Sequence, residues 1–244
     1  MNLIRRTPMP LLFLLALGFA TSCASAQAER IEATQGSHEE ALDDAANSYI
    51  AQAQALEPAT TARLQALAKA RGGEMYKLEY RFKSKKSLLR KVNKILKENP
   101  EFTLADVRID DALRYTMLFP DEPPGNHNQA IHDTLKALTE DGHGVVKVKN
   151  YWPRGDGYSG VNSVLVGPNG LLWELQFQTP LSAETNGKTR HMYEELRKVD
   201  TTIERKRELF DQMTAFWDLV PIPEGILEPG SLHETEQIKD RPRP

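Results

Sequence analysis

Three short segments with strand-like composition follow one another closely, at residues 144–150, 162–167 and 171–179. The last two flank Pro168-Asn169-Gly170, a sequence typical of a hairpin turn, so they are expected to pair with each other. A further strand is expected upstream, over residues 107–119, where β-forming residues alternate. These four segments predict a small mixed sheet.

Apolar residues at helical spacing surround this sheet in the sequence. The predicted helices are residues 38–72, with a break at Glu57-Pro58 that divides them into two, and residues 87–99, 128–139 and 182–217. Helices before, within and after a small mixed sheet predict one α/β (α+β) domain, in which helices flank the sheet. A length of 244 residues without internal repeats fits a single core.

The first 26 residues have the composition of a secretory signal peptide. Arg5 and Arg6 precede an apolar run over residues 9–20, and Ala24-Ser25-Ala26 offers a cleavage site of small residues. No later segment is apolar for long enough to span a bilayer. We therefore expect a signal peptide over residues 1–26, export to the periplasm or the exterior, and no stable membrane span.

The only cysteine, Cys23, lies within this leader. The sequence Ala-Thr-Ser-Cys at residues 20–23 offers an alternative, in which a lipid is attached to Cys23. Cleavage after residue 26 would leave a chain without cysteine, which excludes disulfides and cysteine-ligated metals. A flexible leader is expected over residues 27–37, and an extended, proline-rich tail over residues 226–244.

One basic segment contrasts with the net charge of −3 of the whole chain. Residues 77–97 hold nine basic side chains and a single acidic one. On a helix, Ser87 and Lys91 lie one turn apart, and Lys83 falls on the same line if the helix starts early. This edge can bind a polyphosphate while the neighbouring apolar stripe packs on a sheet. The alternative is a basic face that only contacts solvent.

Four further motifs follow the basic helix in the chain. Together the five are Arg81-x-Lys83-x-x-x-Ser87-x-x-x-Lys91, Asp111-Ala-Leu-Arg114-Tyr-Thr, Lys147-Val-Lys149-Asn-Tyr151, Gly157-Tyr158-Ser-Gly-Val-Asn162 and Glu174-Leu-Gln176-Phe-Gln-Thr179. In order and spacing they resemble the synthetase domain of the RelA/SpoT family, the enzymes that make alarmone nucleotides. The resemblance covers about residues 60–220. It implies a nucleotidyltransferase-like synthetase domain over residues 38–225, which includes N-terminal helices.

The resemblance also implies a reaction, the transfer of pyrophosphate from ATP to the ribose 3′-hydroxyl of a purine nucleotide. It assigns ATP binding to Arg81, Lys83, Ser87, Lys91 and Arg114. It assigns acceptor binding to Lys147, Lys149, Tyr158, Asn162 and Gln176. In this scheme Tyr158 stacks on the acceptor base, and its flanking glycines are expected to leave the ring without bulky local neighbours.

Two carboxylates carry the expected chemistry. Asp111 and Glu174 supply hard oxygen ligands suited to Mg²⁺, the cofactor that the resemblance implies. Glu174 is also the candidate to orient or deprotonate the attacking hydroxyl. Replacing either residue by its amide is expected to abolish turnover and to leave the fold intact, because removing one of two close carboxylates relieves repulsion.

The chain departs from the family pattern at two positions. Ile109 stands where the family has an aspartate, so Asp110 stays an alternative to Asp111 as metal ligand. Asn162 stands where the family has a histidine, and it can donate a hydrogen bond but carries no charge. The acceptor therefore stays open among guanine nucleotides, adenine nucleotides and the end of an RNA.

A synthetase domain behind a signal peptide suggests an exported effector or toxin that meets ATP only inside a target cell. Its expected partners are ATP and a purine nucleotide, together with an immunity protein if the chain is toxic. A degenerate nucleotide-binding envelope protein without catalysis is an alternative that the two departures favour. An RNA-binding domain built on residues 77–97 is a weaker alternative, because aromatic residues are not interleaved with the basic ones.

Overall fold

The structure is a computed structural model, in which the backbone of residues 16–153, 157–228 and 235–237 is described. Side chains are described for residues 39–153 and 157–228. The chain divides into a short unit that ends at Ala45 and a larger unit that begins at Ala46. None of the described helices combines the length and the apolar character that a membrane span requires.

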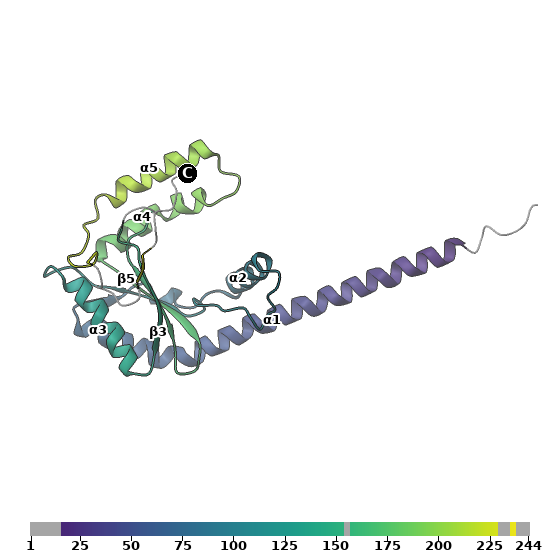
Figure 1. Cartoon of the computed structure of the whole chain (residues 1–244), viewed down its shortest axis with the longest axis horizontal. Coiled ribbons are helices and arrows are strands. Elements are labelled where there is room, and N and C mark those ends of the chain that lie inside the picture. The colour runs from purple at the N-terminus through teal and green to yellow at the C-terminus, as the bar shows by residue number, and fades with distance from the viewer. Residues whose placement is uncertain (1–15, 154–156, 229–234, 238–244) are drawn as a thin grey trace, which may run out of the picture. The chain divides into compact units, whose positions relative to one another are not determined.

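A six-stranded sheet with the order β1-β2-β5-β4-β3-β6 forms the middle of the larger unit (Figure 1). The strands are β1 (Glu74–Met75), β2 (Arg114–Leu118), β3 (Gly144–Asn150), β4 (Val161–Val166), β5 (Leu172–Gln178) and β6 (Thr235–Gln237). Strand β2 is parallel to β5, and β6 is parallel to β3, whereas the other neighbours are antiparallel. The sheet is mixed, as the sequence predicts.

Five α-helices and a 3₁₀ turn accompany the described strands. They are α1 (Ala16–Ala70), η1 (Leu78–Tyr80), α2 (Lys85–Glu98), α3 (Asn126–Glu140), α4 (Pro180–Leu196) and α5 (Ile203–Trp217). Within the larger unit, α3 and the last part of α1 lie on one side of the sheet, and α4 and α5 lie on the other (Figure 1). The predicted α+β class is confirmed.

The predicted break at Glu57-Pro58 is wrong, because α1 continues through Pro58. A proline inside a helix removes one backbone hydrogen bond and crowds the preceding turn. Here Leu56 and Leu64, on either side of the proline, are buried in the hydrophobic core. Thr60 Oγ1 also donates a hydrogen bond to the Leu56 carbonyl at 2.9 Å. Packing of this apolar face therefore outweighs the cost of the proline.

Two other helical predictions also differ from the structure. Residues 27–37, expected to be a flexible leader, lie within α1, whose alanine and glutamate content favours a helix. The segment over residues 182–217 forms two helices, because Thr202 begins a new one by accepting a hydrogen bond from the Arg205 N–H. Of the predicted tail, residues 229–234 and 238–244 lie outside the described residues, and the segment between them is β6.

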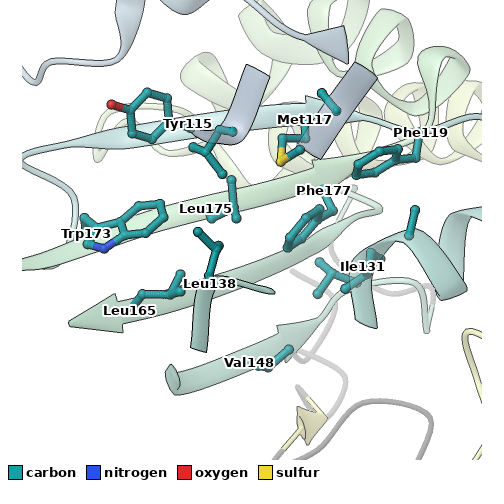
Figure 2. Packing of buried hydrophobic residues seen from close by; sticks show 14 of the residues in the cluster. Tyr115, Met117, Phe119, Ile131, Leu138, Val148, Leu165, Trp173, Leu175 and Phe177 are labelled. Atoms are coloured by element: carbon teal, nitrogen blue, oxygen red, sulfur yellow. The ribbon is translucent and has the colours of Figure 1, made fainter. Parts of the chain in front are cut away.

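Alternation along the strands separates a buried face from a polar one. On the buried face, side chains of β2, β4 and β5 form one hydrophobic core with buried residues of α1 and α3. Figure 2 shows Trp173, Leu175 and Phe177 of β5 in this core. Trp173 has no exposed surface and meets the Tyr115 ring edge-on at a centroid distance of 5.9 Å. The intervening residues of the same strands point to the opposite face, where α4 lies.

Candidate active site

The register of three strands gathers polar side chains on the face opposite the core. Arg114 of β2 lies beside Glu174 of the parallel strand β5, and Thr116 lies beside Gln176. Asn162 of β4 pairs with Gln176 from the other side. Thr116 Oγ1 donates a hydrogen bond to Gln176 Oε1 at 3.2 Å. Because residues in register point to the same face, these side chains form one continuous polar surface.

A pocket of about 870 Å³ opens over this surface, within the size range of small-molecule sites. Six of the residues singled out in the sequence line it, namely Asp111, Arg114, Tyr158, Asn162, Glu174 and Gln176. The remaining walls come from the segment around η1 and from α4. The structure therefore brings together residues that are up to 65 positions apart, from Asp111 to Gln176.

Glu174 is held by two amide side chains. Gln176 Nε2 donates to Glu174 Oε2 at 2.9 Å, and Asn162 Nδ2 donates to Glu174 Oε1 at 3.2 Å. Burial raises the pKa of Glu174, and the charge of Asp111 raises it further, although the bond from Gln176 opposes the shift. A carboxylate that is fixed in orientation and has a raised pKa is suited to accept a proton in a reaction.

Asp111 is bound by two lysines of the basic segment. Lys83 Nζ lies 2.5 Å from Asp111 Oδ2, and Lys91 Nζ lies 2.8 Å from Asp111 Oδ1. Lys91 Nζ also lies 2.5 Å from Asp110 Oδ1. Burial by itself would raise the pKa of Asp111, but the hydrogen bonds from Lys83 and Lys91 outweigh it and lower the pKa. Asp111 is thus an ionised, anchored carboxylate at the edge of the pocket.

The start of α2 fixes the first of these lysines. Lys83 N donates to the Ala112 carbonyl at 3.0 Å, and Phe82 pairs with Leu113 as an antiparallel bridge. Ser84 then caps α2 by accepting a hydrogen bond from Ser87 N, and the two serine hydroxyls are 3.0 Å apart. Ser87 therefore takes part in the helix cap, and it is not among the described residues that line the pocket.

Arg81 is also outside the pocket lining and has a partner that the sequence did not suggest. Its Nε donates to Glu57 Oε1 at 2.7 Å, and its NH1 group donates to the Leu78 carbonyl at 2.9 Å. Glu57 belongs to α1, 24 positions before Arg81. Of the five residues assigned to ATP, only Arg114 lines the pocket within the described part of the chain.

The lysines assigned to the acceptor lie on β3. Lys149 pairs with Asn162 and Lys147 with Val164 in the antiparallel register, so both lie on the polar face of the sheet. Neither is among the described residues that line the pocket. The structure thus places them next to the site, at the strand beyond Asn162.

The expectation that Tyr158 has no bulky neighbours is wrong. Its ring meets those of Tyr151 and Trp217 edge-on, at centroid distances of 5.2 and 6.2 Å. Its hydroxyl donates to Asn162 Oδ1 at 2.9 Å. Because Asn162 in turn donates to Glu174, the Tyr158 hydroxyl is the first member of a chain of hydrogen bonds that ends at the carboxylate.

These linked hydrogen bonds predict that Tyr158→Phe lowers kcat of the pyrophosphate transfer that the motifs imply by roughly tenfold. Without the Tyr158 hydroxyl, Asn162 is held less firmly and no longer fixes the orientation of Glu174. The ring is retained, so KM for the acceptor is expected to change little. Steady-state kinetics of the purified variant provides the measurement. Tyr49→Phe, which removes a hydroxyl that donates to the Val107 carbonyl at 2.8 Å away from the residues that line the pocket, is the matched control for loss of one hydrogen bond and is expected to keep the wild-type kcat. Wild-type kcat in Tyr158→Phe would show that the hydroxyl plays no part.

Several pocket residues are absent from the motifs recognised in the sequence. They are Tyr76, which precedes η1, Asn186 and Arg190 of α4, and Arg197 directly after α4. The α4 residues recur at helical spacing, so a polar stripe on the segment after β5 is a signal that could have indicated them. Lys77 is the first residue of the basic segment over residues 77–97, but its place in the pocket depends on a short turn between β1 and η1 that no sequence pattern indicates.

Mg²⁺ is the metal that the predicted chemistry implies. Among the described residues, no group of three or more His, Cys, Asp or Glu side chains is placed to hold a metal ion. Asp111 and Glu174 nevertheless lie close enough for the charge of one to raise the pKa of the other. Mg²⁺ is commonly bound by two protein carboxylates, while water and substrate phosphates supply its other ligands. The residues present therefore fit this ion.

Comparisons with known proteins give similarities at low sequence identity. The chain is similar to the Type VI effector Tas1, solved with its immunity protein, with 18% identity, a TM-score of 0.48, and coverage of 70% of this chain and 94% of that one. It is similar to small alarmone synthetase 2 from Bacillus subtilis, with 15% identity, a TM-score of 0.49, and coverage of 71% and 92%.

Small alarmone synthetase 1 from Bacillus subtilis, solved with its product pppGpp, is a third similar structure. Its identity is 19% and its TM-score 0.45, with coverage of 68% of this chain and 87% of that one. No protein-family model matches the chain, and no curated protein matches it in sequence.

Proposed function

We propose that this chain is a pyrophosphokinase that transfers pyrophosphate from ATP to the ribose 3′-hydroxyl of a purine nucleotide. The observation that supports the proposal best is the β2–β5 register, which places Arg114 beside Glu174 with Asp111 at the edge of the same pocket. A positioned base, an anchored carboxylate and several cations are the groups that phosphoryl-type transfer requires.

The residues divide the reaction between them. The acceptor's 3′-oxygen attacks the β-phosphorus of ATP, its proton passes to Glu174, and the bond from the β-phosphorus to the oxygen of AMP breaks. Asn162 and Gln176 keep the Glu174 carboxylate in one orientation. Arg114, next to Glu174, supplies positive charge to the phosphates.

Asp111 and Glu174 are the residues that would hold Mg²⁺, with Asp110 as an alternative to Asp111. When bound, this ion neutralises the charge that develops on the transferred group and the departing AMP. The same two carboxylates are therefore assigned to metal binding and, in the case of Glu174, to proton acceptance.

The acceptor is assigned to the β4 side of the pocket. Tyr158 offers a ring to a purine base, and Lys147 and Lys149 lie on the same face of the sheet for the phosphates. The choice between guanine and adenine depends on contacts to the edge of the base. An RNA end is a less favoured acceptor, since the basic helix α2 carries no interleaved aromatic residues.

Incubation of the purified chain, without residues 1–26, with labelled ATP, Mg²⁺ and each acceptor tests the proposal. GDP, GTP, ADP, ATP and an RNA with a free 3′ end form the panel. We expect label in a purine nucleotide product and release of AMP. Label in the RNA alone would contradict the assigned acceptor. Nucleotide binding without any product would favour the non-catalytic nucleotide-binding module instead.

We further propose that the protein is exported and acts as an effector or toxin, with an immunity protein as its partner. Its signal-peptide sequence motivates this part, because an exported synthetase meets ATP only in a recipient cell. Expression of the chain without residues 1–26 in a bacterial cytoplasm is expected to slow growth, and the same chain with Glu174→Gln is expected to be harmless. Equal growth of both strains would contradict a toxic role.

A further inference from the structure

The Tyr158 ring is enclosed by side chains from several elements. It meets the ring of Tyr151, directly after β3, at a centroid distance of 5.2 Å, and the ring of Trp217, at the end of α5, at 6.2 Å. Both contacts are edge-on, with interplanar angles of 78° and 67°. The hydroxyl at the tip of the ring donates to Asn162 of β4 at 2.9 Å. The ring is therefore held at its sides as well as at its hydroxyl.

Two glycines let the backbone of this segment lie close to its neighbours. Gly157 has a φ of 72°, and a Cβ atom there would lie 2.6 Å from Met213 Cε of α5. A Cβ atom at Gly160 would lie 2.7 Å from the Tyr158 hydroxyl and 2.9 Å from the Phe177 carbonyl oxygen. Neither position has room for a side chain as the neighbours stand. The segment thus fits closely against both α5 and β5.

Helix α5 contributes to this enclosure without reaching the pocket. Met213 and Trp217 lie one helical turn apart, are 2% and 4% exposed, and belong to the hydrophobic core. No described residue of α5 lines the pocket, whereas Tyr151 and Tyr158 both do. The contact between Trp217 and Tyr158 is therefore a direct link from α5 to a side chain of the pocket.

We infer that Trp217 is a positioning residue of the acceptor site, which acts through the Tyr158 ring and does not touch the nucleotide. The inference rests on the proposed function for its ligand, a purine nucleotide whose base stacks on Tyr158. Stacking requires the ring to hold one orientation, and edge-on contact with a buried indole restricts rotation of the Tyr158 side chain. Because the ring is fixed before the nucleotide arrives, less side-chain entropy is lost on binding.

The donor side of the pocket is built from other elements. Arg114 belongs to β2 and Asp111 to the segment before it, and β5 separates β2 from β4 in the sheet. The approach to the basic helix α2 is joined to this segment by the ion pair of Lys83 with Asp111. Loss of the Trp217 ring is therefore expected to weaken binding of the acceptor and to leave binding of ATP almost unchanged. A general loss of structure would weaken both.

Calorimetric titrations of the purified chain with GDP, ADP and a non-hydrolysable ATP analogue test the inference. Tyr158→Ala identifies the acceptor probe, which is the diphosphate whose binding it weakens. Trp217→Leu keeps an apolar side chain but removes the ring, and it is expected to weaken binding of the same diphosphate by roughly three- to tenfold, the effect of one aromatic pair. Binding of the ATP analogue, measured with the acceptor probe at saturation, is expected to stay within about twofold of the wild type.

Two further variants separate positioning from packing. Trp217→Phe keeps an aromatic ring beside Tyr158 and is expected to restore most of the lost affinity. Leu209→Ala is the matched control, because Leu209 is also a buried residue of α5, 1% exposed, but lies outside the core cluster that includes Trp217. It is expected to lower Tm, as Trp217→Leu does, and to bind both probes with wild-type affinity.

The double variant Trp217→Leu/Tyr158→Ala shows whether the tryptophan acts through the tyrosine. It is expected to bind the acceptor probe no more weakly than Tyr158→Ala alone, because the ring that Trp217 positions is already absent. Additive losses of affinity would mean that Trp217 acts on the nucleotide by another route, and they would overturn the inference.

Other results would also overturn it. They are a wild-type chain that binds neither diphosphate, binding of both that is unchanged in Tyr158→Ala, acceptor affinity that is unchanged in Trp217→Leu, and equal loss of acceptor and ATP-analogue binding in that variant. The proposed function fails separately. Acceptor binding that depends on Tyr158 and Trp217, in a chain that transfers no pyrophosphate, would leave the positioning role in place and remove only the reaction.

Discussion

Glu174→Gln is expected to lower kcat of pyrophosphate transfer by about 10²–10⁴-fold, the usual contribution of a general base. The amide keeps the size of the side chain and one oxygen, so it retains one of the two hydrogen bonds that Asn162 and Gln176 donate to separate carboxylate oxygens, but it cannot take up a proton. Binding of the ATP analogue is expected to change little. Turnover and analogue binding of the purified variant, measured side by side, provide the result.

The dependence of kcat/KM on pH shows whether the lower activity of Glu174→Gln comes from the loss of a proton acceptor. Burial and Asp111 raise the pKa of Glu174 in the metal-free site, and the wild-type kcat/KM is expected to rise with pH as Glu174 loses its proton. The residual activity of Glu174→Gln should lack this limb. Glu194→Gln is the matched control, since Glu194 also lines the pocket but is exposed and paired with Arg190. A Glu174→Gln enzyme that keeps the same limb would assign it to another group.

The sheet is the part of the fold that the sequence predicts best. Strands β3, β4 and β5 lie within one residue of the predicted segments, since alternation and a hairpin turn both define them. The prediction for β2 was too long at its start, because residues 107–112 form no strand and Leu113 forms only an isolated bridge with Phe82. Strand β1 and η1 have two and three residues, which is too short for any periodicity to reveal.

The helix boundaries were predicted wrongly where they depend on tertiary packing. Local rules place a break at Pro58, but whether a proline ends a helix depends on the burial of the turns around it. Leu64, with no exposed surface, and Ala68, with 2% exposed, show that α1 continues into the core after the proline. The sequence around residue 200 likewise shows helix on both sides, and only the cap at Thr202 separates α4 from α5.

The candidate site, like the fold, could be predicted from the sequence only in part. Arg114, Asn162 and Glu174 occur in separate motifs, and strand register is sufficient to bring them together. The partners of the basic residues could not be predicted, because Arg81–Glu57 and Lys83–Asp111 join elements 24 and 28 positions apart. A motif shows that a lysine is present, but it does not show whether that lysine forms an ion pair with a carboxylate of the same chain.

Asp111→Asn is expected to abolish turnover and also to destabilise the fold, which differs from the expectation based on sequence. Asp111 accepts hydrogen bonds from Lys83 and Lys91, so the amide leaves the partly buried Lys83 without its carboxylate partner, whereas Lys91 keeps Asp110. Loss of charged hydrogen bonds of this kind costs about 2 kcal/mol, which lowers Tm by roughly 4–8 °C in a chain of this size. Thermal unfolding near neutral pH provides the measurement.

The direction in which the Tm difference changes with pH distinguishes loss of the Asp111 ion pairs from a general loss of structure. The pKa of Asp111 is lowered in the folded protein, so its contribution to stability is fully present above its ordinary pKa and is lost as pH falls through the lowered value. The Tm difference between Asp111→Asn and the wild type should therefore shrink in acid.

Glu174→Gln is the natural comparison, because its opposite pKa shift makes the ionised carboxylate a cost to folding near neutral pH. Its Tm is expected to equal or exceed that of the wild type. Adding Lys83→Met to Asp111→Asn should recover part of the lost stability, since it removes the cation that the first substitution leaves without a carboxylate. Equal Tm values for Asp111→Asn and the wild type would mean that solvent screens the lysine pairs, as it does for exposed ion pairs, and that Asp111 is not anchored by them.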